Sequence, residues 1–224
     1  MKIDFASCIV TGGSYMRARV ESAMTNYDEA SAPYFQLILS KRKEAFCDSA
    51  CGFLLLDGLL QKNKIDRSDI VITVDKRNRP HISAEYLDFS VSHSEGCALC
   101  ALAVGNGAED VTIGCDVQRM RDYSREKMAE LSHAFMNERE LAQFERDNFN
   151  SDDFFTAWTH RESYVKRAGA DIFEALRNAD LDGELFIDGV IYACGEKYRY
   201  SINRPQLSAE EIAEIEEKNE NTCY

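Results

Sequence analysis

Residues 151–169, SDDFFTAWTHRESYVKRAG, have the sequence of a complete helix and organise the second half of the chain. The opening SDD offers an N-terminal cap, and Gly169 is well placed to end the helix. Trp158, Glu162 and Lys166 follow one another at intervals of four residues, so they share one face of this helix. A carboxylate and an ammonium group on one face have two interpretations. They form a solvated surface pair, worth about 0.3–0.5 kcal/mol, or they hold a metal and meet a phosphate oxygen. We interpret Trp158 as a core anchor.

The stretch VTIGCDVQ, residues 111–118, is predicted to be a strand whose two faces differ in character. Its odd-numbered residues are apolar, and its even-numbered residues include Asp116 and Gln118. These two side chains point the same way with only Gly114 beside them, which is expected to leave room for a ligand. A carboxylate and an amide oxygen suit a hard cation such as Mg²⁺. The alternative is a polar strand face turned to water.

Composition excludes several classes of protein. The chain has 224 residues, 45% of them hydrophobic and 29% charged, which is enough apolar surface for a packed core. A net charge of −13 argues against nonspecific binding to nucleic acid or to anionic membranes. No apolar run approaches the roughly 20 residues of a membrane span, and Asp4 interrupts the N-terminal apolar run, so we expect a soluble cytoplasmic protein without a signal peptide. The acidic end, LSAEEIAEIEEKNENTCY, is predicted to be a solvated helix.

The eight cysteines do not form the pattern of a disulfide framework. Cys97 and Cys100 would point to opposite faces of a strand, and Cys47 and Cys51 have helical spacing among apolar residues. We therefore expect reduced, mostly buried thiols and no structural zinc site.

The order of elements predicts an α+β fold. Helices are expected for residues 31–63, 124–147 and 151–169. Strands are expected for KIDFASCIV, IVITV, LDFSVSHS, GCALCALAVG, VTIGCDV, GELFIDGVIYACG and KYRYSIN. The turn sequence NGAED predicts a β-hairpin between the fourth and fifth of these strands. Each half reads as a small antiparallel sheet with helices, which predicts two similar subdomains, residues 1–106 and 107–224.

Further polar residues form candidate anion sites. Ser92 and His93 stand at the end of the strand LDFSVSHS, where they either form an anion pocket or the serines bond their own backbone in a turn. Lys41 and Lys43 lie in SKRKEAF, and Arg79 lies in KRNRP. Such cationic clusters in an acidic chain indicate a local anion site or a solvated face. The chain has no G-x-S-x-G elbow, phosphate-binding loop or dinucleotide fingerprint.

Four motifs together resemble a known family. RP at 79–80, FSVSHS at 89–94, GCDVQ at 114–118 and WTHRESYVK at 158–166 resemble, in this order, the motifs of the phosphopantetheinyl transferases of the surfactin-synthetase (Sfp) type. The resemblance covers roughly residues 35 to 170 and implies a pseudo-dimer with the active site in a cleft between its subdomains.

The resemblance also implies a metal centre and its catalytic residues. Asp116 and Glu162 would bind Mg²⁺, with Mn²⁺ as an alternative, and Gln118 would be the third metal-binding residue. Lys166 would neutralise charge on the transferred phosphate, and Glu162 would help to deprotonate the nucleophile, directly or through water. Asp116, Glu162 and Lys166 are therefore the expected catalytic residues.

Coenzyme A would be the substrate, and the resemblance assigns six residues to its binding: Lys41, Lys43, Arg79, Pro80, Ser92 and His93. Arg79, Ser92 and His93 match positions that contact the 3′-phosphate. The chain departs from the family at three places. Gln118 replaces an acid found in many members, Arg161 replaces a lysine, and Cys51-Gly52 stand where a helix arginine is usual.

The implied reaction moves 4′-phosphopantetheine from coenzyme A to a serine of an apo acyl or peptidyl carrier protein and releases 3′,5′-ADP. Carriers of fatty-acid, polyketide or nonribosomal-peptide biosynthesis are all compatible, and we expect a monomer. Two alternatives stay open. One is a catalytically degenerate relative that binds carriers, and the other is a metal-dependent phosphohydrolase acting on a nucleotide.

Overall fold

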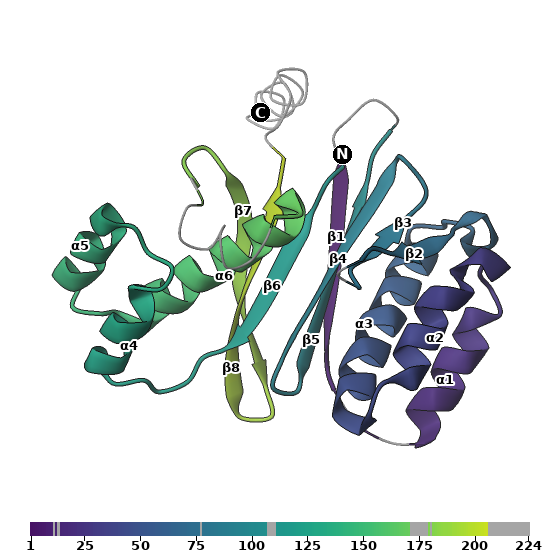
Figure 1. Ribbon diagram of the computed structural model, residues 1–224, viewed down its shortest axis with the longest axis horizontal. Coiled ribbons are helices and arrows are strands. Elements are labelled where there is room, and N and C mark those ends of the chain that lie inside the picture. Colours follow the sequence, from purple (N-terminus) through teal and green to yellow (C-terminus); the bar gives the residue numbers. More distant parts are fainter. Residues whose placement is uncertain are drawn as a thin grey trace, which may run out of the picture.

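The computed structural model describes residues 1–10, 12, 14–76, 78–106, 111–170, 179 and 181–205 (Figure 1). The α-helices are α1 (Ser14–Met24), α2 (Ala32–Ser40), α3 (Lys43–Lys62), α4 (Arg125–Ser132), α5 (Glu138–Arg146) and α6 (Ser151–Ala168). Two short 3₁₀ turns are η1 (Glu29–Ser31) and η2 (Arg67–Asp69). The strands are β1 (Lys2–Ile9), β2 (Ile72–Val74), β3 (Pro80–Ile82), β4 (Leu87–Ser94), β5 (Cys97–Val104), β6 (Gly114–Arg119), β7 (Leu185–Ala193) and β8 (Glu196–Arg204).

The strands form small antiparallel sheets, in the orders β1-β5-β4, β2-β3 and β6-β8-β7. The prediction of an α+β fold with small antiparallel sheets packed with helices is confirmed. The two subdomains with their boundary at residues 106–107, and the pseudo-dimeric cleft, stay predictions.

The two larger sheets pack against each other, and helices cover their outer faces (Figure 1). Strand β5 is buried on both faces, as its run of small apolar residues predicts. Cys100 and Leu102 pack toward the helices α1, α2 and α3, whereas Leu99 and Ala101 pack against the sheet β6-β8-β7. Helix α6 contacts β6 and β8. This packing places the face of β6 that bears Asp116 and Gln118 against α6.

The edges of the two sheets meet at β4 and β6 through side chains rather than through a backbone ladder. Asp88 Oδ2 accepts a hydrogen bond from Ile113 N at 2.8 Å, and Ser90 Oγ accepts one from Cys115 N at 2.9 Å. Ser94 Oγ accepts one from Arg119 N at 3.0 Å. We call this contact the β4–β6 joint. Ser94 lies within β4 and bonds the backbone of β6, so the alternative in which the serines at the end of this strand bond their own backbone in a turn is wrong for this residue.

Gly114 marks the closest approach of β6 to α6. A Cβ atom at this position would overlap the carbonyl oxygen of Ser163 and lie 2.6 Å from the amide nitrogen of Arg167. The space beside Asp116 at Gly114 was expected to admit a ligand. It is filled by the backbone of α6, so that expectation is wrong.

Three other expectations about elements need correction. The predicted hairpin is wrong, because β5 pairs with β1 and β4, and β6 pairs with β8. Helix α1 lies outside the three predicted helical ranges, and it buries Met16, Val20 and Ala23. The predicted helix 124–147 is divided into α4 and α5 by a second N-terminal cap at Asn137. The predicted acidic C-terminal helix lies outside the described residues.

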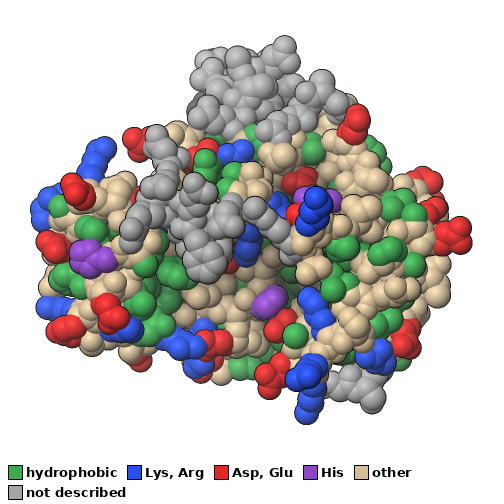
Figure 2. Space-filling view, viewed as in Figure 1, with side chains coloured by type: hydrophobic (Ala, Val, Ile, Leu, Met, Phe, Trp, Pro, Cys, Tyr) green, Lys and Arg blue, Asp and Glu red, His purple; other side chains and the backbone are tan. Residues whose placement is uncertain are grey.

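The surface and the thiols agree with the composition. Figure 2 shows acidic and basic side chains interspersed over one face of the molecule, without a broad patch of either sign. The seven cysteines within the described ranges are thiols that form no disulfide, and five of them are buried. Among the helices that the structure describes, none has both the length and the apolar character needed to cross a membrane.

Candidate active site

Helix α6 carries the central residues of the candidate site, and its ends are fixed by their sequence. Asn150 accepts a hydrogen bond from Asp152 N at 2.8 Å, so the N-terminal cap is Asn150 and not a residue of the predicted SDD. Gly169 ends the helix with a left-handed φ of 65°, as predicted. The apolar residues Phe154, Phe155 and Val165 are buried, which fixes the orientation of the face that bears Glu162 and Lys166.

A cavity of about 330 Å³, here called the catalytic cavity, brings together residues of β4, β6 and α6. Its described lining residues are Val91, Ser92, His93, Asp116, Gln118, Trp158, Glu162 and Lys166. The two stretches singled out in the sequence, 111–118 and 158–166, therefore contribute to one site. Trp158 also packs edge-on against Phe135, with ring centroids 5.0 Å apart, so it is both a core residue and a wall of this cavity.

Asp116, Lys166 and Ser92 form a closed hydrogen-bonded triangle in the catalytic cavity. Lys166 Nζ donates to Asp116 Oδ1 and to Ser92 Oγ, each at 2.9 Å. Ser92 Oγ donates to Asp116 Oδ1 at 2.8 Å. Asp116 is only 5% exposed, so the interpretation of a strand face turned to water is wrong for this residue. Lys166 forms its ion pair with Asp116 across the cavity, and not the solvated surface pair with Glu162 that helical spacing alone suggested.

The catalytic cavity shifts the pKa values of Glu162 and Lys166. Burial raises the pKa of Glu162 to about 7, and the negative charge of Asp116 adds to the rise, while Lys166 opposes it. For Lys166, burial is the largest single influence and would lower the pKa, but the attraction of Asp116, together with smaller contributions from Cys115 and Glu162, outweighs it, and the pKa is raised. Near neutral pH the site therefore holds a fixed cation beside Asp116 and a carboxyl group, Glu162, poised to exchange a proton.

The residues of the catalytic cavity fit a divalent cation with oxygen ligands. Asp116 Oδ2 is buried and has no hydrogen-bond partner among the described residues, which is costly unless a cation binds there. Glu162 and the amide of Gln118 line the same cavity. No group of three or more His, Cys, Asp or Glu side chains in the described ranges could form a metal site by itself. A cation here would need other oxygen ligands, as Mg²⁺ does when it binds substrate phosphates.

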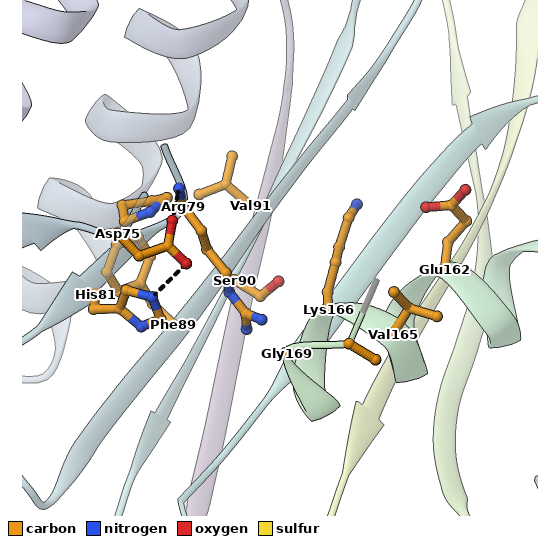
Figure 3. A pocket seen from close by; sticks show the side chains of 12 residues that line it. Asp75, Arg79, His81, Phe89, Ser90, Val91, Glu162, Val165, Lys166 and Gly169 are labelled. Atoms are coloured by element: carbon orange, nitrogen blue, oxygen red, sulfur yellow. Dashed lines mark hydrogen bonds and ion pairs between the residues drawn. The ribbon is translucent and has the colours of Figure 1, made fainter. Parts of the chain in front are cut away.

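A second cavity, of about 630 Å³, lies between α6 and the β3–β4 region (Figure 3). We call it the outer cavity. Glu162 and Lys166 line both cavities, so the two adjoin, and Arg79 and Pro80 line the outer one. A Cβ atom on Gly169 would lie 3.8 Å from Arg79 Nη1, so the guanidinium reaches the C-terminal end of α6. Figure 3 shows Glu162 and Lys166 projecting from α6 in the same direction.

The remaining predicted binding residues lie at different distances from these cavities. His93 lines the catalytic cavity, and its Nδ1 lies 3.6 Å from Asp48 Oδ2. Lys41 donates to Ser49 Oγ at 2.7 Å and Lys43 begins α3. Neither lysine is among the described lining residues of the two cavities.

The sequence reasoning missed residues of the outer cavity. Asp75 Oδ1 accepts a hydrogen bond from Arg79 N at 2.8 Å, and Asp75 Oδ2 lies 3.5 Å from His81 Nε2 (Figure 3). Asp75 thus holds the turn that presents Arg79. His81 directly follows Arg79-Pro80, and that adjacency was the available signal. No sequence pattern indicated Asp75.

Two departures from the family motif have structural explanations. A Cβ atom on Gly52 would lie 2.5 Å from Val91 Cγ1, so α3 packs too closely on β4 to carry a larger side chain there. Arg161 is 1% exposed and pairs with Glu140 of α5, with its guanidinium 5.8 Å from the Phe135 ring centroid. It therefore joins α5 to α6 and does not line the described site.

The site contains two carboxylates and an ammonium group, and it adjoins a cavity lined by the guanidinium group of Arg79. These groups define the class of site. They are the groups that phosphoryl transfer requires, because that reaction depends mainly on positioning and charge neutralisation.

Comparisons with known proteins agree with this class. Residues 112–217 match the model of the 4′-phosphopantetheinyl transferase superfamily. The chain is 24% identical over 167 residues to 4′-phosphopantetheinyl transferase gsp of Aneurinibacillus migulanus, covering 74% of this chain and 65% of the relative. It is 25% identical over 176 residues to 4′-phosphopantetheinyl transferase pptA of Paxillus involutus, covering 70% and 66%. The chain thus aligns with slightly less than two thirds of these relatives. The resemblance to the phosphopantetheinyl transferases is confirmed.

Proposed function

We propose that this protein transfers 4′-phosphopantetheine from coenzyme A to a serine of an apo acyl or peptidyl carrier protein. The observation that carries the proposal is the meeting of Asp116, Glu162 and Lys166 in one cavity that adjoins the Arg79-bearing outer cavity. The matched family segment, residues 112–217, contains Asp116, Glu162 and Lys166 and supports the assignment.

In the proposed reaction, one residue of this site accepts the proton that is released and another stabilises the negative charge. The carrier serine oxygen forms a bond to the phosphorus next to pantetheine, and the bridging P–O bond of the pyrophosphate breaks. The leaving group is 3′,5′-ADP. The proton of the serine hydroxyl passes to Glu162, directly or through water. In the metal-free site the pKa of Glu162 is about 7, and a base whose pKa lies near the working pH suits this role. Lys166 stabilises the negative charge on the transferred phosphate.

Metal binding is assigned to Asp116, Glu162 and Gln118. These residues would hold Mg²⁺, or Mn²⁺, which would neutralise charge on the pyrophosphate. The free oxygen Oδ2 of the buried Asp116 supports this assignment.

Coenzyme binding is assigned to Arg79, Pro80 and His93, with Lys41 and Lys43 farther out; the role of Ser92 is taken up below. The cleft would then lie between subdomains 1–106 and 107–224, within one chain, which fits a cytoplasmic monomer. The positions of Arg79 and His93 at the outer and catalytic cavities support the first part of this assignment.

The test is intact-mass analysis of apo carrier proteins of the fatty-acid, polyketide and nonribosomal-peptide types. Each carrier is incubated with the protein, coenzyme A and Mg²⁺. We expect at least one carrier to gain a single phosphopantetheine arm, and Glu162→Gln to abolish the gain. The exposed α5 substitution Glu145→Gln removes the same charge elsewhere and should leave the gain intact.

Two other results would replace the proposal. Coenzyme A cleavage without any carrier would identify a phosphohydrolase. Carrier binding without coenzyme binding or transfer would identify the degenerate relative.

A further inference from the structure

The hydroxyl of Ser92 forms hydrogen bonds with the catalytic residues Asp116 and Lys166. Ser92 is 5% exposed on β4, and its oxygen lies 2.8 Å from Asp116 Oδ1 and 2.9 Å from Lys166 Nζ. A serine hydroxyl has one proton to donate, and here that proton is directed to Asp116. A coenzyme phosphate accepts hydrogen bonds, so it would need a donor that Ser92 already uses.

The neighbouring serines show that this arrangement is particular to Ser92. Ser90 and Ser94 point to the same side of β4, because side chains alternate along a strand. Both are buried, and both accept hydrogen bonds from the β6 backbone at the β4–β6 joint. Ser92, between them, donates to a side-chain carboxylate instead.

This bond determines which oxygen of Asp116 remains available. Oδ1 accepts hydrogen bonds from both Ser92 and Lys166, whereas Oδ2 has no hydrogen-bond partner among the described residues. Without these donors, the carboxylate could rotate about its Cβ–Cγ bond and present either oxygen.

We infer that Ser92 is a positioning residue that orients the Asp116 carboxylate for a divalent cation, and does not contact the 3′-phosphate of the coenzyme. The inference rests on the proposed function, since it concerns the metal and coenzyme of that same site. It assigns discrimination of the 3′-phosphate to other groups, with Arg79 and the half-exposed His93 as the candidates.

The experiment measures two affinities of the whole protein. The first is the affinity for Mn²⁺ alone, by calorimetric titration. The second is the ratio of the affinities for coenzyme A and 3′-dephospho-coenzyme A at one fixed metal concentration. The metal contribution is common to both ligands, so the ratio reports contact with the 3′-phosphate.

The variants are Ser92→Ala, Ser92→Thr and the matched control Ser94→Ala. Ser94→Ala removes a buried hydroxyl from the same face of β4 but leaves the bonds to Asp116 intact. For Ser92→Ala we expect Mn²⁺ binding to weaken about 10-fold or more, as for other residues that orient a metal ligand, with the coenzyme ratio unchanged. Ser92→Thr keeps the hydroxyl and should retain Mn²⁺ affinity within about threefold of the wild type, which is below the loss that such residues cause.

The inference is overturned if Ser92→Ala reduces the coenzyme ratio, whatever its effect on Mn²⁺, because the hydroxyl would then contact the phosphate. It is also overturned if Ser92→Ala weakens Mn²⁺ binding no more than Ser94→Ala does. If Ser92→Ala does not fold, Ser92→Thr decides, since a 10-fold loss with the hydroxyl retained would contradict a role carried by that group. If the wild-type protein binds neither Mn²⁺ nor coenzyme A, the proposed function is overturned together with the inference. Failure of the proposed function is therefore seen in the wild type, whereas failure of the inference alone is seen only in the Ser92 variants.

Discussion

Replacing Glu162 by glutamine should stabilise the metal-free protein, by an amount that grows with pH. Burial and Asp116 raise the pKa of Glu162 from 4.5 to about 7 in the folded state. Between these two pH values the folded protein keeps a proton that the unfolded chain has lost. The unfolded state therefore binds fewer protons, and stability falls as pH rises through this interval. Glutamine has no such dependence, so the advantage of the variant is small below pH 4.5 and complete above about pH 7.

The size of the effect follows from the two pKa values. At about 1.4 kcal/mol for each pH unit between them, the gain in the free energy of unfolding is at most about 3 kcal/mol. For a chain of this size, that corresponds to roughly 6–12 °C in Tm.

The assay is thermal unfolding with a chelator present, at about pH 5 and about pH 8, where linkage predicts different gains. Glu145→Gln, which removes a carboxylate from the exposed surface of α5, is the control and should show no comparable pH-dependent gain. Equal gains for Glu162→Gln at the two pH values would refute the reasoning, because the stabilisation would then not come from the ionisation of this carboxyl group.

Three further predictions concern packing and thiols. Gly114→Ala should destabilise the protein by about 3 kcal/mol, since the added methyl group meets the backbone of α6; Gly58→Ala, with nothing within 4 Å, should stabilise it by up to about 1 kcal/mol. Thermal unfolding of both variants checks this, and equal shifts would contradict the packing argument. Gly52→Arg should not improve coenzyme A binding in a calorimetric titration, because its Cβ atom would lie 2.5 Å from Val91 Cγ1; tighter binding by a folded variant would show that α3 can move away from β4. The exposed Cys194 should react with an aromatic disulfide reagent before the buried cysteines, which include Cys100 and Cys115, and burial raises the pKa of both these thiols. Rapid reaction of all thiols in the native protein would contradict their burial.

Local patterns in the sequence predicted the elements better than their pairing. The continuous apolar run of β5, which is buried on both faces, and the Gly169 stop of α6 are visible in adjacent residues, and both predictions were confirmed. The hairpin failed because a turn sequence reports only local backbone preference, whereas β6 pairs with β8, which is distant in the sequence. Helix α1 was missed because its apolar residues do not mark one face: Met16, Val20 and Ala23 are buried, whereas Tyr15 and Ala18 are exposed.

The candidate site was predictable where it depended on periodicity. Helical spacing placed Glu162 and Lys166 on one face, and strand alternation placed Asp116 beside Gln118. Sequence could not show that Lys166 pairs with Asp116, or that Ser92 donates to it, because these contacts depend on how α6 and β4 approach β6. Gly114 misled for the same reason: the missing side chain accommodates a helix and not a ligand.

The β4–β6 joint has a consequence for how such a site can change. In a backbone ladder, adjacent strands are held about 4.8 Å apart by atoms common to every residue. At this joint the spacing is set by the lengths of the side chains of Asp88, Ser90 and Ser94. Exchanging a short hydroxyl for a longer acceptor would widen the gap between the two sheets without altering either sheet. The separation between Arg79, before β3, and Lys166, on α6, is thus adjustable in small increments by point substitution. The width of the outer cavity, which both residues line, would change with that separation.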